Sequence, residues 1–173
     1  MSEYGTYETI DGRPALKFER SYSHPVEKVW RAITDPGELA HWFPAQMTFE
    51  PRVGAPVSFV FPDGGMPSSE GEIKELDPPR VFVFSWEDEL LTFELEPAGD
   101  GACVLRFTHI LSERGQAAGV AGGWHLCFEE LKKRLAGLPA EAPGTTPTER
   151  SRKLHALYEE RGLPSGAPMP TEN

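Results

Sequence analysis

The alternation of apolar and polar residues predicts strands through most of the first 110 positions. In "TYETIDGRPALKFERSY" two strands meet at Asp11-Gly12, a favoured hairpin dipeptide, and Arg20 shares one face of the second strand with Leu16, Phe18 and Tyr22. From residue 46 onward the period of two returns. One apolar and one polar face per strand indicates an antiparallel sheet covered on one side. The segments concerned are "PVSFVF", "SSEGEIKEL", "RVFVFSWE", "LLTFELEP" and "ACVLRFTHI".

Two short helices are predicted between the first hairpin and the later strands. "HPVEKVWRAIT" carries apolar residues at helical spacing, with Pro25 suited to the first helical position. In "DPGELAHWFPA", Asp35 is the expected N-cap, Glu38 the residue that reaches back in a capping box, and Pro44 the stop. Neighbouring helical residues diverge by about 100°. We therefore expect Trp42 to face a cavity or its rim and Phe43 to pack among the short helices and the following loop.

A longer helix follows the strands and is the expected cover of the sheet. From Trp124 an apolar stripe continues through Cys127, Phe128, Leu131 and Leu135, with charged residues outside it. The preceding "GQAAGVAGG" is expected to be a flexible approach to this helix. The predicted fold class is therefore α+β, with a first domain over residues 1–137 whose closed core includes Trp30, Ile33, Phe93 and Leu131.

Residues 138–173 form a proline-rich tail in which one short amphipathic helix is predicted, at about 147–161. Thr146 to Glu149 resembles a capping box, Pro147 suits the first helical position and Gly162 is the expected stop. An isolated helix of about 15 residues is marginal in water. The narrow stripe of Leu154, Leu157 and Tyr158 should therefore dock on its own domain or on a second copy of the chain, giving a homodimer.

Charge and segment composition narrow the classes of partner. The chain has 17 basic and 27 acidic residues, a net charge of −10, and its one basic cluster is "KKRL" at 132–135. Nucleic-acid binding is therefore not expected, because a polyanion needs a basic surface. No apolar run is long enough to span a membrane, and the first residues lack the pattern of a signal peptide, so the expected location is cytoplasmic.

The sequence carries no recognisable catalytic, metal or cofactor motif. The five histidines lack metal-ligand spacing, and Cys103 and Cys127 suggest buried thiols rather than a disulfide framework. Nucleophile-elbow, phosphate-loop and dinucleotide-binding patterns are also missing from the sequence. We accordingly predict no catalytic residue, no metal ligand and no cofactor.

Aromatic residues on the predicted covered faces are the remaining functional signal. They could line an apolar pocket for a small molecule, or they could fill an ordinary core. His109 has the same inward phase as Leu105 and Phe107, so its imidazole could be satisfied by a neighbour or could orient a ligand or relay a proton. The candidate ligand-binding residues are Trp42, Phe59, Phe61, Phe84, Trp86, Phe93, His109, Trp124 and Phe128.

Four segments in this order resemble the SRPBCC superfamily, and most closely the homologues of the activator of Hsp90 ATPase. They are "HPVEKVWRAITDPGELAHWF", "GEIKELDPPRVFVFSWE", "LRFTHI" and "GGWHLCFEELKKRLAG", and the resemblance covers roughly residues 10–137. It implies a helix-grip, START-like fold, in which a curved antiparallel sheet wraps a long C-terminal helix above a hydrophobic cavity. Trp42, Trp86, His109 and Trp124 match positions that characterise the family.

The resemblance leaves three hypotheses for function. Relatives in the superfamily bind lipids, hormones or polyketides, which favours binding of a small hydrophobic or aromatic molecule in the cavity. Some relatives are aromatases or cyclases, so a second hypothesis is an enzyme of the cyclase or hydrolase kind that uses His109. The namesake domain stimulates a chaperone ATPase, and the third hypothesis is a protein-interaction or chaperone-cofactor module. Fold alone does not choose among them.

Overall fold

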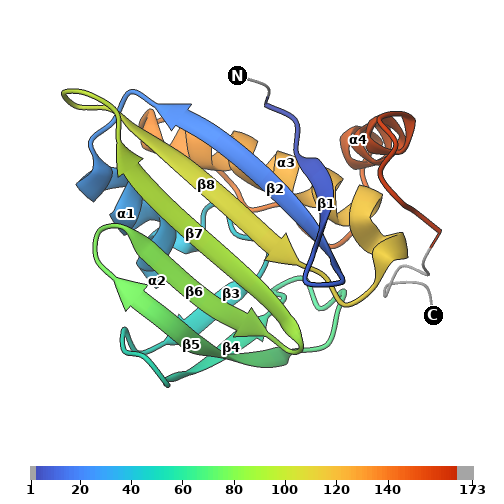
Figure 1. Ribbon diagram of the computed structural model, residues 1–173, viewed down its shortest axis with the longest axis horizontal. Coiled ribbons are helices and arrows are strands. Elements are labelled where there is room, and N and C mark those ends of the chain that lie inside the picture. Colours follow the sequence, from blue (N-terminus) through green and yellow to red (C-terminus); the bar gives the residue numbers. More distant parts are fainter. Residues whose placement is uncertain (1–2, 167–173) are drawn as a thin grey trace.

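The computed structural model describes residues 3–166 as one curved antiparallel sheet with helices on its concave side (Figure 1). The sheet has eight strands in the order β1-β2-β8-β7-β6-β5-β4-β3. The elements are β1 (Thr6–Ile10), β2 (Arg13–Tyr22), α1 (Val26–Thr34), α2 (Pro36–Leu39), β3 (Gln46–Phe49), β4 (Pro56–Val60), β5 (Ser69–Asp77), β6 (Val81–Trp86), β7 (Glu89–Pro97), β8 (Cys103–Ile110), the short 3-10 turn Arg114–Gln116, α3 (Ala117–Leu135) and α4 (Glu149–Glu160). This confirms the α+β helix-grip prediction.

The strand register gathers the inward residues of the central strands into rows. Phe107 of β8 lies opposite Phe18 of β2 and Phe93 of β7, and His109 lies opposite Leu16 and Leu91. Because side chains alternate across a strand, each row points to the same face. The row of rings faces α3, which crosses that side of the sheet (Figure 1).

The helix α3 begins at Ala117, so the prediction of a flexible glycine-rich approach is wrong. Ala117, Ala118 and Ala121 are fully buried. A Cβ at Gly122 would lie 3.3 Å from the backbone nitrogen of His155, in α4. The small residues therefore let a second helix approach, and the packing outweighs the low helix propensity of glycine.

The helix α4 docks on its own domain. Leu154 and Tyr158 are buried, and the Tyr158 hydroxyl accepts a hydrogen bond of 2.9 Å from the backbone N–H of Gly5. Gly162 stops the helix in the left-handed region at φ 91°, as predicted. The ends of the predicted domain and tail, residues 1–2 and 167–173, lie outside the described residues, and the boundary after residue 137 stays a prediction.

Local details at the helix ends differ from the sequence predictions. Pro25 is the N-cap of α1 rather than its first residue, and Trp30 is half-buried at the edge of the core, whereas Ile33, Phe93 and Leu131 are fully buried. Glu38 does not reach back to Asp35. It forms a two-bonded ion pair with Arg134 of α3, at 2.8 and 3.1 Å. The ion pair with Arg134 thus takes the place of the bond that the Glu38 side chain was expected to accept from the Asp35 N–H in a capping box.

The capping box of α4 is displaced by two residues from the predicted position. Thr148 is the N-cap, its hydroxyl accepts from the N–H of Ser151, and the Ser151 hydroxyl accepts from the N–H of Thr148. Serine at the third position therefore supplies the reciprocal bond that Glu149 was expected to make to Thr146. The helix starts at Glu149 as a consequence.

Candidate ligand-binding site

The concave side of the sheet holds a continuous aromatic cluster. Its rings are in mutual contact: Phe59 stacks on Trp86 with centroids 4.2 Å apart, and Phe107 lies 4.7 Å from both Phe93 and Trp124. Eight of the nine predicted ligand-binding residues are buried there, and Trp86 is half-buried. The aromatic cluster is Trp42, Phe43, Phe59, Phe61, Phe82, Phe84, Trp86, Phe93, Phe107, Trp124 and Phe128.

Trp42 and Phe43 both enter this cluster, so the predicted division between them is wrong. Trp42 is fully buried, stacks on Phe128, and donates its indole N–H to the Ala32 carbonyl at 2.9 Å. Phe43 lies against Trp86 and Trp124, with its ring at 85° to that of Trp42. The turn after α2 lies between the sheet and α3. The side chains of Trp42 and Phe43 therefore both meet an apolar surface, although they diverge.

A hollow of about 440 Å³ opens at the edge of the aromatic cluster, and we call it the rim hollow. Among the described residues that line it, Phe43 is the one aromatic residue, and it belongs to the cluster as well. None of the nine predicted residues lines it. The other lining residues are Ala40, Pro44, Ala45, Gln46, Pro62, Asp63, Glu141, Ala142, Pro143 and Gly144.

One wall of the rim hollow is the segment 138–146, which we call the strap. Asp63, in the loop after β4, accepts hydrogen bonds from the N–H of Thr145 at 2.6 Å and from its hydroxyl at 2.9 Å. These bonds, the Thr145 backbone bond foremost, hold the pKa of Asp63 below its usual value. A Cβ at Gly65 would lie 1.7 Å from the Thr145 hydroxyl oxygen, so the close approach requires glycine there.

His109 is fixed by partners on both ring nitrogens. The indole N–H of Trp124 donates to Nδ1 at 2.9 Å, so the proton of the neutral ring is on Nε2, which donates to Glu89 at 2.5 Å. Glu89 also accepts from the Ser112 hydroxyl at 2.8 Å. Burial raises the pKa of Glu89, but the bonds from His109 and Ser112 outweigh it, and the net pKa lies below the usual value.

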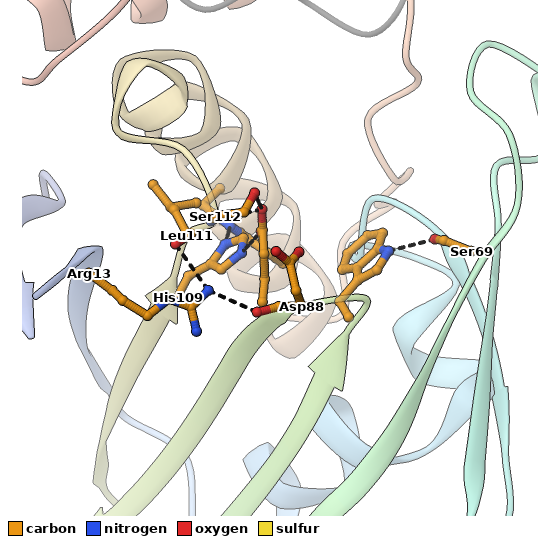
Figure 2. A network of polar contacts seen from close by, with 9 residues as sticks. Arg13, Ser69, Asp88, His109, Leu111 and Ser112 are labelled. Atoms are coloured by element: carbon orange, nitrogen blue, oxygen red, sulfur yellow. Dashed lines mark hydrogen bonds and ion pairs between the residues drawn. The ribbon is translucent and has the colours of Figure 1, made fainter. Parts of the chain in front are cut away.

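The order of this network differs from that of an activated serine. Glu89 lies between His109 and Ser112, whereas general-base activation needs the imidazole next to the hydroxyl. Figure 2 shows His109 and Ser112 together beside Asp88, whose carbonyl accepts from the Arg13 guanidinium at 2.8 Å. The network therefore joins the ends of β7 and β8 to α3 and positions Trp124.

A second buried histidine, His125, was missed by the sequence analysis. It is 3% exposed, and its Nδ1 lies 2.9 Å from the hydroxyl of Tyr158 in α4. Burial lowers its pKa. No local sequence pattern could reveal this contact, because Tyr158 lies 33 residues from His125 along the chain, far outside the spacing of residues within one helix.

The described residues 3–166 offer neither a cluster of metal ligands nor a membrane-spanning helix. No group of three or more His, Cys, Asp or Glu side chains within that span is arranged to hold a metal ion. Cys103 and Cys127 are free and buried, and burial raises the pKa of both thiols. No helix among the described residues has the length and apolar character needed to cross a membrane.

Comparison with known proteins agrees with this fold. Residues 23–136 match the family model described as "Activator of Hsp90 ATPase homolog 1-like protein". A search of curated protein sequences found no match.

Solved structures extend the likeness over most of the chain. The crystal structure of CalU16 from Micromonospora echinospora is 22% identical, covers 92% of this chain and 94% of its own, and superposes with a TM-score of 0.70. EF2215 from Enterococcus faecalis, described as a conserved protein of unknown function, is 19% identical over 91% of this chain and 89% of its own, with a TM-score of 0.70. MLL2253 from Mesorhizobium loti is 27% identical over 71% and 96%, with a TM-score of 0.63.

Proposed function

We propose that this chain, which belongs to the Activator of Hsp90 ATPase homolog 1-like family, binds a small apolar or aromatic molecule in the rim hollow. Family and fold are those of a ligand-binding type of domain within the SRPBCC superfamily. The proposal moves the binding site from the packed centre of the aromatic cluster to its edge.

The observation that carries the proposal is that Phe43 belongs both to the lining of the rim hollow and to the aromatic cluster. Phe43 is one of the residues that line the rim hollow, and its ring, which is buried, contacts Phe59, Phe84, Trp86 and Trp124. A ligand in the hollow would therefore lie against a wall that is backed by the packed aromatic cluster. Most of the remaining wall is alanine and proline, and a mainly apolar concavity of a few hundred Å³ is typical of small-molecule sites.

The two other hypotheses have less support. Both ring nitrogens of His109 are already engaged, which favours a positioning role over acid–base catalysis. The apolar stripe of α4, which could have docked a partner, is packed on its own domain.

A bulky substitution in the strap tests the proposal. Ala142→Trp would fill the rim hollow from the half-buried strap without replacing a core residue. The matched control is Ala102→Trp, because Ala102 lines a second hollow of about 390 Å³ between the turns near Pro25, Pro79 and Gly99. We expect the neutral fluorescent probe phenylnaphthylamine to bind wild type and Ala102→Trp, and to lose at least tenfold in affinity with Ala142→Trp, a loss of about 1.4 kcal/mol.

Unchanged probe binding in Ala142→Trp would contradict the proposal. Loss of binding in Ala102→Trp alone would move the site to the second hollow. Amide chemical shifts in a titration give an independent location, and those of Gln46, Asp63 and Gly144 should move most.

A further inference from the structure

We infer that docking of the strap and binding of a ligand in the rim hollow are coupled: the docked strap completes the binding site, and a bound ligand holds the strap in place. The inference rests on the proposed function and concerns how that same site is regulated. It is carried by the share of the wall that the strap supplies and by the way the strap is attached to the domain.

The strap supplies a large part of the wall of the rim hollow. Four of the eleven lining residues, Glu141 to Gly144, belong to it, and the others lie in the turn after α2, at the start of β3 and in the loop after β4. A ligand against this wall would lose part of its contacts if the strap moved away. The docked strap should therefore bind the ligand more tightly than the released strap, and a ligand shifts a conformational equilibrium only through such a difference.

The strap is anchored at its two ends and has no buried residue of its own. All of residues 136–153 are exposed or half-buried, whereas Leu135 before them and Leu154 after them are buried. Segments with few buried contacts open at a lower free energy than the core to which they are attached. The strap can therefore leave the hollow while α3 and α4 stay folded.

Hydrogen bonds near each end hold the strap in its docked position. The Glu141 N–H donates to the Glu130 carboxylate at 3.1 Å, and the N–H and hydroxyl of Thr145 donate to Asp63 at 2.6 and 2.9 Å. We call the bonds between Thr145 and Asp63 the clasp. Among the described residues that line the hollow, neither Thr145 nor Gly65, which lies against it, is included. A substitution at either position therefore changes the docking of the strap without removing a wall residue.

Coupling between the strap and the ligand must be reciprocal. Releasing the strap lowers the affinity for the ligand, and the ligand in turn lowers the population of released strap. A ligand that binds only the docked state reduces that population by the factor 1 + [L]/Kd, which is about tenfold at a free ligand concentration of roughly nine times Kd. The Thr145 amide, which donates to Asp63 only in the docked strap, reports this population.

Amide hydrogen exchange of the wild-type chain, with and without phenylnaphthylamine, measures the effect of the ligand on the strap. At roughly nine times Kd of the free probe, we expect exchange of the Thr145 amide to slow about tenfold. The control is the Arg52 amide, which donates to the Glu50 carbonyl at 2.8 Å in a turn that does not line the hollow, and its exchange should stay unchanged. This measurement needs no substitution.

Variants of the clasp measure the effect of the strap on the ligand. In Gly65→Ala the new Cβ would lie 1.7 Å from the Thr145 hydroxyl oxygen. The docked strap should become a minor state, which lowers the affinity for phenylnaphthylamine by about threefold or more. Thr145→Val removes only the hydroxyl of the clasp and should act in the same direction to a smaller extent. Thr9→Val, the same chemical change at an exposed position of β1, is the control and should leave the affinity unchanged.

The outcomes separate failure of the coupling from failure of the site. If the probe binds wild type and loses affinity with Ala142→Trp, but neither changes Thr145 exchange nor distinguishes Gly65→Ala from wild type, the coupling is wrong and the proposed function stands. If the probe does not bind wild type, or binds Ala142→Trp equally well, both are wrong.

Two further results would overturn the coupling. Faster Thr145 exchange with the probe, or tighter binding by Gly65→Ala, would mean that the strap obstructs the hollow instead of completing it. Equal slowing of the Thr145 and Arg52 amides would mean that the probe stabilises the whole domain and not the strap.

Discussion

The indole N–H of Trp124 in α3 donates a hydrogen bond to Nδ1 of His109 in β8, over 2.9 Å between two side chains that are almost completely buried. This single bond ties the long helix to the sheet and decides which ring nitrogen of His109 carries the proton. The proton is on Nε2, which donates a hydrogen bond of 2.5 Å to the carboxylate of Glu89. Three elements are thus joined through one imidazole.

Replacing His109 with phenylalanine should destabilise the protein by about 1–3 kcal/mol, because it leaves the Trp124 N–H without its acceptor and removes the His109 donor from Glu89. The free energy of unfolding from denaturant melts checks this. His155→Phe is the matched control, on the partly exposed side of α4, and should change stability by less than about 0.5 kcal/mol. Equal effects of the two substitutions would show that the buried network contributes nothing specific.

Leu131→Ala should cost about 2–5 kcal/mol of unfolding free energy, since the side chain is fully buried between α3 and the sheet. Leu138→Ala makes the same chemical change at a position that is 57% exposed and should cost less than about 0.5 kcal/mol. A small loss in Leu131→Ala would mean that α3 does not close the core at this point.

Tyr158→Phe removes only the hydroxyl that accepts from the Gly5 N–H and contacts His125. The buried N–H of Gly5 is then left without an acceptor, so the free energy of unfolding is expected to fall by about 1–3 kcal/mol. Truncation after Gly137 should lower the melting temperature further, because it also removes Leu154 and Leu163 from the core. A truncated chain that melts at the temperature of the full chain would contradict the docking of α4.

The buried His125 should make stability depend on pH. Burial lowers its pKa from the usual value near 6.5, so between the folded and unfolded pKa values the unfolded chain binds more protons. Stability should therefore fall as the pH is lowered from about 6.5 to the folded pKa, by at most about 1.4 kcal/mol per pH unit. The facing groups are Tyr158, Glu129, Arg20 and Tyr4, and the attraction of Glu129 opposes the shift.

Unfolding free energies of wild type and His125→Gln at about pH 7.5 and about pH 5.5 isolate this contribution. Wild type should lose more stability than the variant over that interval, because glutamine does not titrate. Parallel losses would assign the pH dependence to other groups.

Gly65→Ala should release the strap. The added Cβ would lie 1.7 Å from the Thr145 hydroxyl oxygen and 2.8 Å from the Thr145 Cβ, so the bonds between Thr145 and Asp63 cannot persist. Amide exchange of Thr145 should accelerate about tenfold, the equivalent of one lost hydrogen bond to a charged group. Gly123→Ala, where no atom lies within 4 Å of the new Cβ, is the control and should leave that exchange rate unchanged.

Periodicity in the sequence was sufficient to predict the sheet, the hairpin at Asp11-Gly12, the inward row that includes Phe107 and His109, and the helix that covers it. These features follow from local rules: alternation sets which face is buried, and a stripe at helical spacing sets which side of a helix is buried. The resemblance to a known family added the helix-grip arrangement, which the family match confirms.

What only the tertiary structure decided depends on residues far apart in the chain. The glycine-rich start of α3 is helical because α4 packs on it, and His125 is buried because Tyr158 reaches it from that helix. The rim hollow has the same origin, since Phe43, Asp63 and Glu141 come from three separate segments. Sequence patterns report the local period of a chain, whereas a hollow exists only where separate segments meet. The sequence alone therefore determined the layers of this protein, and the meeting of the strap with the edge of the aromatic cluster determined where the rim hollow lies.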